Sequence, residues 1–133
     1  MAFAGMNYLA ILIAALAAYA WGAAYYTTLS KQWLAAAGLT EVKRSVTPFV
    51  ISFIAVLVMA FVLAGSIGHL GAGNVSIKNG TISGIIIWAG FVATTVVVNN
   101  AYPGRKYMLS IIDSLHWLGV LVIQGAVIGA MGV

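Results

Sequence analysis

The residues whose types could do chemistry lie on one apolar run near the C-terminal end of the chain. Asp113, His116 and Gln124 occur there among residues that are otherwise mostly apolar. At about 100° per residue along a helix, the three fall on one face together with Trp117 and Val120. An ionisable group inside a membrane is costly and often marks a substrate or proton path, and histidine titrates near neutral pH. Asp113 beside His116 is therefore a candidate proton relay.

A structural interpretation of the same residues competes with this one. Asp113 lies about one turn into its predicted helix, where a carboxylate interacts favourably with the helix dipole and with local backbone donors. His116 and Gln124 can hydrogen-bond to neighbouring helices instead of acting on a substrate. The residue types alone leave both interpretations open.

Polar residues on two other apolar runs could meet this face. On the run at residues 81–102, Trp88, Thr95 and Asn99 share one helical face, and the first run brings Trp21, Tyr25 and Tyr26. The candidate polar pocket therefore consists of Tyr25, Thr95, Asn99, Asp113, His116 and Gln124. We expect the pocket to face the cytoplasm. We also expect Asp113 to be buried against the first and third runs, within reach of a donor such as Tyr25, Asn99 or His116.

Four apolar runs must position these residues. They cover residues 6–26, 48–70, 81–102 and 109–131, and each is near the roughly 20 residues that cross a bilayer as a helix. The chain is 63% hydrophobic and only 6% charged, which is too few charges to cover a water-facing surface. The runs do not alternate as barrel strands must. The sequence predicts an all-α membrane protein, a four-transmembrane-helix bundle that forms a single integral membrane domain over residues 1–133.

The segments between the runs carry turn and cap signals. Ser30 could cap a short helix that Gly38 ends, and we expect this helix to lie in the membrane interface, in the first cytoplasmic loop, with Trp33 as its anchor. Pro48 suits the first turn of the second long helix. Asn79-Gly80 favours positive φ and predicts a small hairpin turn before the third long helix.

The distribution of charge predicts the orientation. The first and third loops hold most of the basic residues, namely Lys31, Lys43, Arg44, Arg105 and Lys106. The second loop and both ends of the chain hold only Lys78. Because basic loops stay in the cytoplasm, the first and third loops are predicted to be cytoplasmic and both termini to lie outside.

Small residues at helical spacing predict close packing between helices. Ala14, Ala18 and Gly22 form such a ladder on the first run, and Gly125 and Gly129 form one on the fourth. Such residues let helix backbones approach closely in lipid. The glycines could pack within one bundle, or they could face a second protomer. We predict a homo-oligomer with Gly125 and Gly129 at or near the contact.

Several classes of function are excluded or left without support. The chain has no cysteine, which excludes disulfides, zinc-thiolate sites and thiol nucleophiles. Its net charge of +4 is dispersed between apolar runs, so membrane topology explains it better than nucleic-acid binding. No phosphate-binding glycine loop, catalytic triad or pair of carboxylates is recognisable. We therefore expect no enzyme activity, cofactor or metal, and the lipid bilayer is the predicted partner.

The order of several short motifs points to a family. They are Asn7-Tyr8-Leu9-Ala10, Gly22-Ala23-Ala24-Tyr25-Tyr26, Lys31-Gln32-Trp33, Pro48 with Ile51-Ser52-Phe53, Gly90-Phe91-Val92-Ala93-Thr94, Asn99-Asn100, Gly104-Arg105 and Gly125-Ala126-Val127-Ile128-Gly129. Over nearly the whole chain they resemble the bacterial membrane family labelled domain of unknown function 1761. The family often has Trp-Tyr-Ser-Pro where this chain has Tyr25-Tyr26-Thr27-Thr28. The resemblance implies four helices in a bacterial inner membrane and supplies no activity.

Two main functional hypotheses follow, and a membrane enzyme that acts on lipid ranks behind both. The first is a structural, accessory or oligomer-forming binding subunit, which the scarcity of catalytic groups favours. The alternative is a small transporter or channel that uses a cytoplasm-facing pocket around Asp113, His116 and Asn99. The sequence names no small-molecule ligand for either hypothesis.

Overall fold

The computed structural model describes residues 5–133, and the regular elements in this range are all helical. The elements, in chain order, are α1 (Tyr8–Thr28), α2 (Ser30–Ala37), α3 (Thr47–Gly68), the 3-10 turn η1 (Ala72–Asn74), α4 (Ile77–Ile87), the π-helical turn η2 (Trp88–Val92), α5 (Ala93–Ala101) and α6 (Tyr107–Met131). Because α4, η2 and α5 run on without a break, four helical segments are long and apolar enough to cross a membrane. The predicted all-α class is confirmed.

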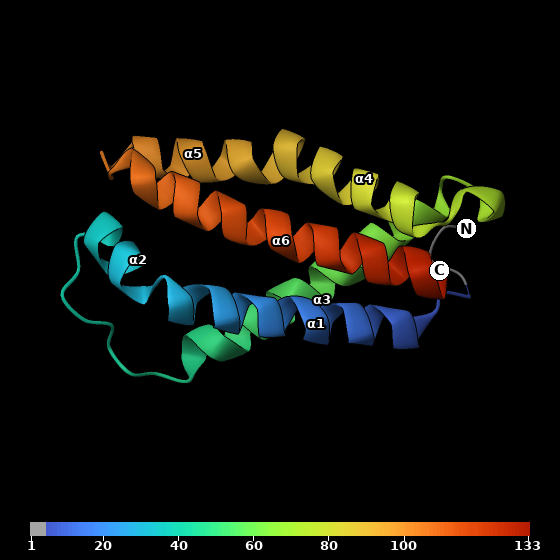
Figure 1. Ribbon diagram of the computed structural model, residues 1–133, viewed down its shortest axis with the longest axis horizontal. Helices are drawn as coiled ribbons and strands as arrows, with labels where there is room; N and C mark the ends of the chain where they lie inside the picture. Colours follow the sequence, from blue (N-terminus) through green and yellow to red (C-terminus); the bar gives the residue numbers. More distant parts are fainter. Residues whose placement is uncertain (1–4) are drawn as a thin grey trace.

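Helix α6 is the central element of the bundle. It contacts every other long helix, and its most extensive partner is α4. Figure 1 shows α4 and α5 along one side of α6, α1 along the other, and α3 crossing behind. At one end, Asn7 Nδ2 donates to Met131 O at 3.1 Å. At the other end, Lys106 Nζ donates to Ala35 O at 3.1 Å, which joins the third loop to α2. The basic first and third loops therefore lie together.

Side-chain caps and turns set the helix boundaries. Asn7 caps α1 by accepting from Ala10 N at 3.0 Å, and Pro48 lies in the first turn of α3 as predicted. The short helix of the first loop is also present, and it ends at Gly38 with a φ of 72°. Ser30 does not cap it, because α2 follows α1 after a single intervening residue and Leu29 occupies the cap position.

The predicted hairpin at Asn79-Gly80 is wrong. Ser76 accepts from Asn79 N at 3.1 Å and caps α4, so both residues lie in the first turn of that helix. The third long helix therefore begins at Ile77 rather than at residue 81. A side-chain cap satisfies backbone donors that a turn would otherwise have to place elsewhere.

The glycines of α6 pack inside the chain. Gly125 and Gly129 are buried. A Cβ atom at Gly125 would collide with the carbonyl of Gly80, and one at Gly129 would collide with the carbonyl of Ser76. The two backbones approach closely because these positions lack side chains. The prediction that Gly125 and Gly129 lie at a contact between two protomers is therefore wrong, because α4 of the same chain already covers them.

The ladder of small residues on α1 is also used internally. Ala14 and Ala18 are completely buried, and they belong to a core cluster with Val56, Leu63 and Val120 from α3 and α6. In contrast, large apolar side chains are exposed along the outer faces of all four long segments. Such a surface suits lipid rather than water as the surrounding solvent.

The π-helical turn η2 rotates the helix that follows it. Gly84 before the turn and Trp88 at its start face α6. In α5, which follows the turn, the half-buried positions are Ala93, Val96 and Asn100. Val96 and Asn100 each lie one residue later than a continuous α-helix from Trp88 would place them, because a π turn accommodates one extra residue. This shift decides which polar residues of α5 reach the bundle interior.

Candidate functional site

Asp113 is held by two aromatic donors from different elements. Its Oδ1 atom accepts from Tyr26 Oη at 2.7 Å and from Trp33 Nε1 at 3.1 Å. Tyr26 belongs to α1 and Trp33 to α2. The carboxylate is therefore half-buried against α1 as expected, but its second donor comes from α2 rather than from the third run, and neither donor is among those proposed from the sequence. The short helix of the first loop supplies one of them.

Neighbouring donors of α1 bind the backbone of α6 rather than its side chains. Tyr25 Oη donates to Ile112 O at 2.7 Å, and Trp21 Nε1 donates to His116 O at 3.0 Å. These bonds fix the rotation of α6 relative to α1. Tyr25 is thus next to the site without contacting the carboxylate by a hydrogen bond.

His116 is buried among aromatic rings. Only 8% of the residue is exposed, and its ring centroid lies 4.7 Å from that of Tyr26 and 4.6 Å from that of Trp117. A Cβ atom added at Gly22 would lie 2.8 Å from His116 Nε2. Glycine at this position therefore makes room for the imidazole. Within residues 5–133, His116 Nδ1 has no hydrogen-bond partner.

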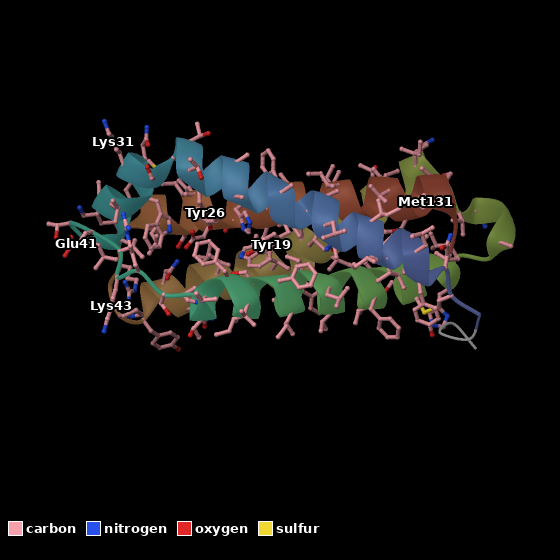
Figure 2. The ribbon with its side chains drawn as sticks, turned by 90° about the horizontal axis from the view of Figure 1, so that it is seen from below. Tyr19, Tyr26, Lys31, Glu41, Lys43 and Met131 are labelled. Atoms are coloured by element: carbon pink, nitrogen blue, oxygen red, sulfur yellow. The ribbon has the colours of Figure 1, made fainter. Side chains whose placement is uncertain are left out.

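A cavity of about 700 Å³ lies between α1, α3 and α6, and His116 forms part of its wall. We call it the α1–α3–α6 cavity. Its other lining residues include Tyr19, Gly22, Tyr26, Ser52 and Trp117. Figure 2 shows Tyr19 and Tyr26 in the space between α1 and α3.

The cavity exists because α3 leaves the bundle at its N-terminal end. The buried residues of α3 begin only at Val56, and the turns before it, including Phe49 and Ser52, are mostly exposed. Tyr19 Oη reaches across and donates to Phe49 O at 3.2 Å. On the opposite wall, the small residues Ala18 and Gly22 leave the volume unfilled.

Three residues predicted for the pocket do not join it. Thr95 and Asn99 are exposed, and the Thr95 hydroxyl donates to Phe91 O within its own helix at 2.5 Å. Because η2 adds one residue, Asn100 takes the inward position and donates to Ser110 Oγ at 3.2 Å. Gln124 is fully buried, farther along α6, where it donates to Val56 O at 2.7 Å. The predicted pocket is therefore wrong for these three residues, while Tyr25, Asp113 and His116 do come together.

The predicted pocket did not include Tyr26, Trp33 or Gly22. Tyr26 and Trp33 are the nearest aromatic donors on either side of the break at Leu29. Asp113 lies at the same end of the bundle, and a buried carboxylate requires hydrogen-bond donors. A tyrosine and a tryptophan near that end were therefore the signal that could have predicted these contacts. No comparable signal marked Gly22, because its role depends on the position of His116.

Three hydroxyl groups of the cavity wall already donate hydrogen bonds within the protein. Tyr19 donates to Phe49 O, Ser52 donates to Pro48 O at 2.6 Å, and Tyr26 donates to Asp113. Their oxygen atoms can still accept hydrogen bonds. His116 is the buried side chain of the wall that retains an unused ring nitrogen. In the described part of the chain, no group of His, Asp and Glu side chains could hold a metal ion.

Comparisons with known proteins give one result. The family described as "Protein of unknown function (DUF1761)" matches residues 9–129. No curated protein and no solved structure matches the chain. The family match spans α1 to the last turn of α6 and includes every residue of the site described above. The chain therefore belongs to the DUF1761 family.

Proposed function

We propose that the protein is a membrane-embedded binding protein that holds a small organic molecule in the α1–α3–α6 cavity. One observation carries this proposal. The cavity of about 700 Å³ contains in its wall a histidine that is only 8% exposed and has an unpaired ring nitrogen. A buried polar atom without a partner costs free energy. The Nδ1 atom of His116 has almost no accessible surface, so a ligand that satisfies it must turn the imidazole toward the cavity. Binding pockets typically enclose roughly 300–1,000 Å³.

The cavity wall indicates the chemistry of the ligand. Aromatic and small apolar side chains, such as Phe49, Val56 and Trp117, would contact a mainly apolar body. A neutral imidazole offers one donor and one acceptor, so His116 would bind a single hydroxyl, carbonyl or amine group. The oxygens of Tyr19 and Ser52 would accept from a donor on the ligand. An apolar molecule with one compact polar group fits this wall best.

The orientation in the membrane belongs to the same proposal. We place the protein in a bacterial inner membrane with both ends of the chain outside, which the grouping of the basic loops at one end of the bundle supports. The α1–α3–α6 cavity lies toward that end, since Tyr26, Ser30 and Phe49 line it. A ligand would then be reached from the cytoplasmic half of the bilayer.

The test is to identify what the protein retains. The full chain is placed in lipid nanodiscs, extracted with organic solvent, and compared by mass spectrometry with empty nanodiscs. Ala23→Trp fills the cavity from α1, where Ala23 is exposed and lines it. Ala20→Trp is the matched control, because Ala20 is exposed on the same helix but does not line the cavity.

The expected result is a compound that is enriched with the wild type and with Ala20→Trp and is lost with Ala23→Trp. His116→Leu should lose it as well, while circular dichroism shows that the helices are retained. Identical extracts from Ala23→Trp and Ala20→Trp would contradict the proposal.

Transport is the alternative, and the placement of Asp113 beside His116 favours it. These residues are about one turn apart on α6, and Tyr26 contacts both of them. A protein that couples movement to protons needs a group that can release one. In proteoliposomes that contain the compound identified above, Asp113→Asn should then abolish pH-dependent movement without reducing binding. Equal movement in the variant and the wild type would eliminate the alternative.

A further inference from the structure

A second cavity lies on another flank of α6 and shares no lining residue with the first. It has a volume of about 490 Å³ and lies between α5 and α6. We call it the α5–α6 groove. Exposed apolar side chains form its rims, with Val97 on α5 and Ile111 and Leu115 on α6. It is therefore open toward the surroundings of the helices, which in a membrane are acyl chains.

Small residues and the π-helical turn create the groove. Ala93 and Ala101 on α5 face Ser110 and Ser114 on α6, so the two helices leave a channel between them. The turn η2 immediately precedes this stretch and determines which side of α5 faces α6. π turns inside helices are frequent at functional sites.

The floor of the groove is polar at its loop end. Asn100 Nδ2 donates to Ser110 Oγ at 3.2 Å, which leaves the second Nδ2 hydrogen and the Oδ1 atom of the side chain free for another partner. Ser114 lies at the other end of the groove, beside Leu115, and its unpaired hydroxyl has almost no accessible surface. Asn100 therefore supplies the hydrogen-bonding atoms for a polar group at the loop end.

A positive charge closes the loop end. Arg105 lines the groove, and no carboxylate pairs with it among residues 5–133. Of the two acidic residues of the chain, Asp113 is held by Tyr26 and Trp33, and Glu41 lies in the first loop. A guanidinium group binds phosphate through two parallel hydrogen bonds. Basic pockets between membrane helices at the cytoplasmic side are typical sites for anionic headgroups.

The geometry points to a binding site for one anionic phospholipid in the α5–α6 groove. Its phosphate binds Arg105, its glycerol ester region meets Asn100, and an acyl chain follows the apolar rims toward Leu115. The order of charge, hydrogen-bonding groups and apolar wall along the groove is the order of these parts in a phospholipid. From Arg105 to Leu115 the groove runs about 12–15 Å at 1.5 Å per residue, which accommodates the upper part of one chain.

The test is native mass spectrometry of the full chain in detergent, titrated separately with phosphatidylglycerol and phosphatidylcholine of the same acyl chains. Two pairs of variants separate the headgroup from the chain. Arg105→Gln removes the charge in the groove, and Arg44→Gln removes one from the first loop. Ala101→Trp fills the groove, and Val98→Trp places the same ring on the exposed face of α5 outside it.

We expect one bound phosphatidylglycerol that is preferred over phosphatidylcholine. Arg105→Gln should weaken phosphatidylglycerol binding about fivefold, the effect of one basic residue near a membrane surface, and should leave phosphatidylcholine unchanged. Ala101→Trp should lose both lipids, while Arg44→Gln and Val98→Trp match the wild type. Circular dichroism confirms that each variant folds.

Three outcomes would overturn the site. Equal losses of phosphatidylglycerol binding in Arg105→Gln and Arg44→Gln would show that the lipid is attracted to the basic end of the bundle as a whole. Wild-type occupancy in Ala101→Trp would show that no chain enters the groove. Displacement of phosphatidylglycerol by millimolar glycerol phosphate would show a site for a soluble anion rather than a lipid. None of these outcomes concerns the α1–α3–α6 cavity, so they test this inference separately from the proposed function.

Discussion

At the scale of single residues, the carboxylate of Asp113 joins three elements of the fold. It lies on α6 and accepts hydrogen bonds from Tyr26 on α1 and Trp33 on α2. The bond from Trp33 holds the short helix of the first loop against the bundle. Asp113 therefore has a structural role whether or not it also moves a proton.

Replacing Tyr26 with phenylalanine tests this role. The variant removes one donor to a carboxylate, which should lower the free energy of unfolding by about 1.5 kcal/mol. Unfolding in sodium dodecyl sulfate, followed by circular dichroism, measures the change. Tyr102→Phe is the control, because Tyr102 is 90% exposed. Equal stability of the two variants would show that the bond to Asp113 contributes nothing.

A second prediction at this scale concerns the space that Gly22 leaves for the His116 ring. A methyl group at Gly22 would meet His116 Nε2 at 2.8 Å, whereas Gly90 has no neighbour within 4 Å of an added Cβ atom. Gly22→Ala should therefore displace the imidazole and cost about 1–3 kcal/mol, as overpacking does. Gly90→Ala should be neutral or stabilising. The same unfolding titration compares them, and a stable Gly22→Ala variant would mean that the ring shifts without cost.

At the scale of elements, the approach of α4 to α6 depends on glycines in both helices. Gly80 and Gly125 bring their backbones together, and each would clash with the other if it carried a side chain. In lipid, close packing replaces hydrophobic burial as the force that associates helices. The contact between α4 and α6, which we call the α4–α6 seam, thus lies within one chain.

Substitutions at this seam should change stability rather than association. Gly125→Ala is expected to cost about 1–3 kcal/mol through overpacking, while the mass of the protein in detergent, measured by light scattering, stays that of the wild type. A smaller mass in detergent with unchanged stability would instead show that Gly125 lies at a contact between protomers. Any homo-oligomer should form through the exposed faces of other helices.

The π-helical turn also makes a prediction at the element scale. Deleting Phe91 removes the extra residue and leaves Asn100 facing Ser110, because the turn acts as a one-residue insertion. Deleting Val97, outside the turn, should rotate Asn100 by about 100° away from α6. The chain has no cysteine, so disulfide formation between Asn100→Cys and Ser110→Cys reports the result. Cross-linking should persist in the first deletion and fail in the second, and the reverse pattern would refute the assignment of the turn.

At the scale of the whole molecule, charge is divided between the two ends of the bundle. Five of the six basic residues lie with α2 and the first and third loops, and Figure 2 shows Lys31 and Lys43 at the end opposite Met131. The proposed orientation, with the basic end in the cytoplasm, rests on this asymmetry. Both cavities extend toward that end.

Cysteine labelling tests the orientation in intact cells. Val42→Cys lies in the first loop and Lys78→Cys near the start of α4 at the opposite end. A membrane-impermeant maleimide should label position 78 and should reach position 42 only after the cells are opened. Labelling of position 42 in intact cells would mean that the protein is inverted.

The sequence by itself determined the class of the protein and the course of its helices. Continuous apolar runs with few charges permit helices and little else in lipid, and the short helix ending at Gly38 followed from local glycine chemistry. The fourth run also showed that Asp113 and His116 share a face, because neighbours within one helix are set by its period alone.

Only the tertiary structure decided which helices those residues meet. Tyr26 and Trp33, rather than Asn99, reach Asp113, because a single extra residue in η2 turns Asn99 outward and Asn100 inward. The partner of Gly125 depended in the same way on where α4 lies. Helical period fixes directions within an element, but contacts between elements depend on rotations that one inserted residue can change by about 100°.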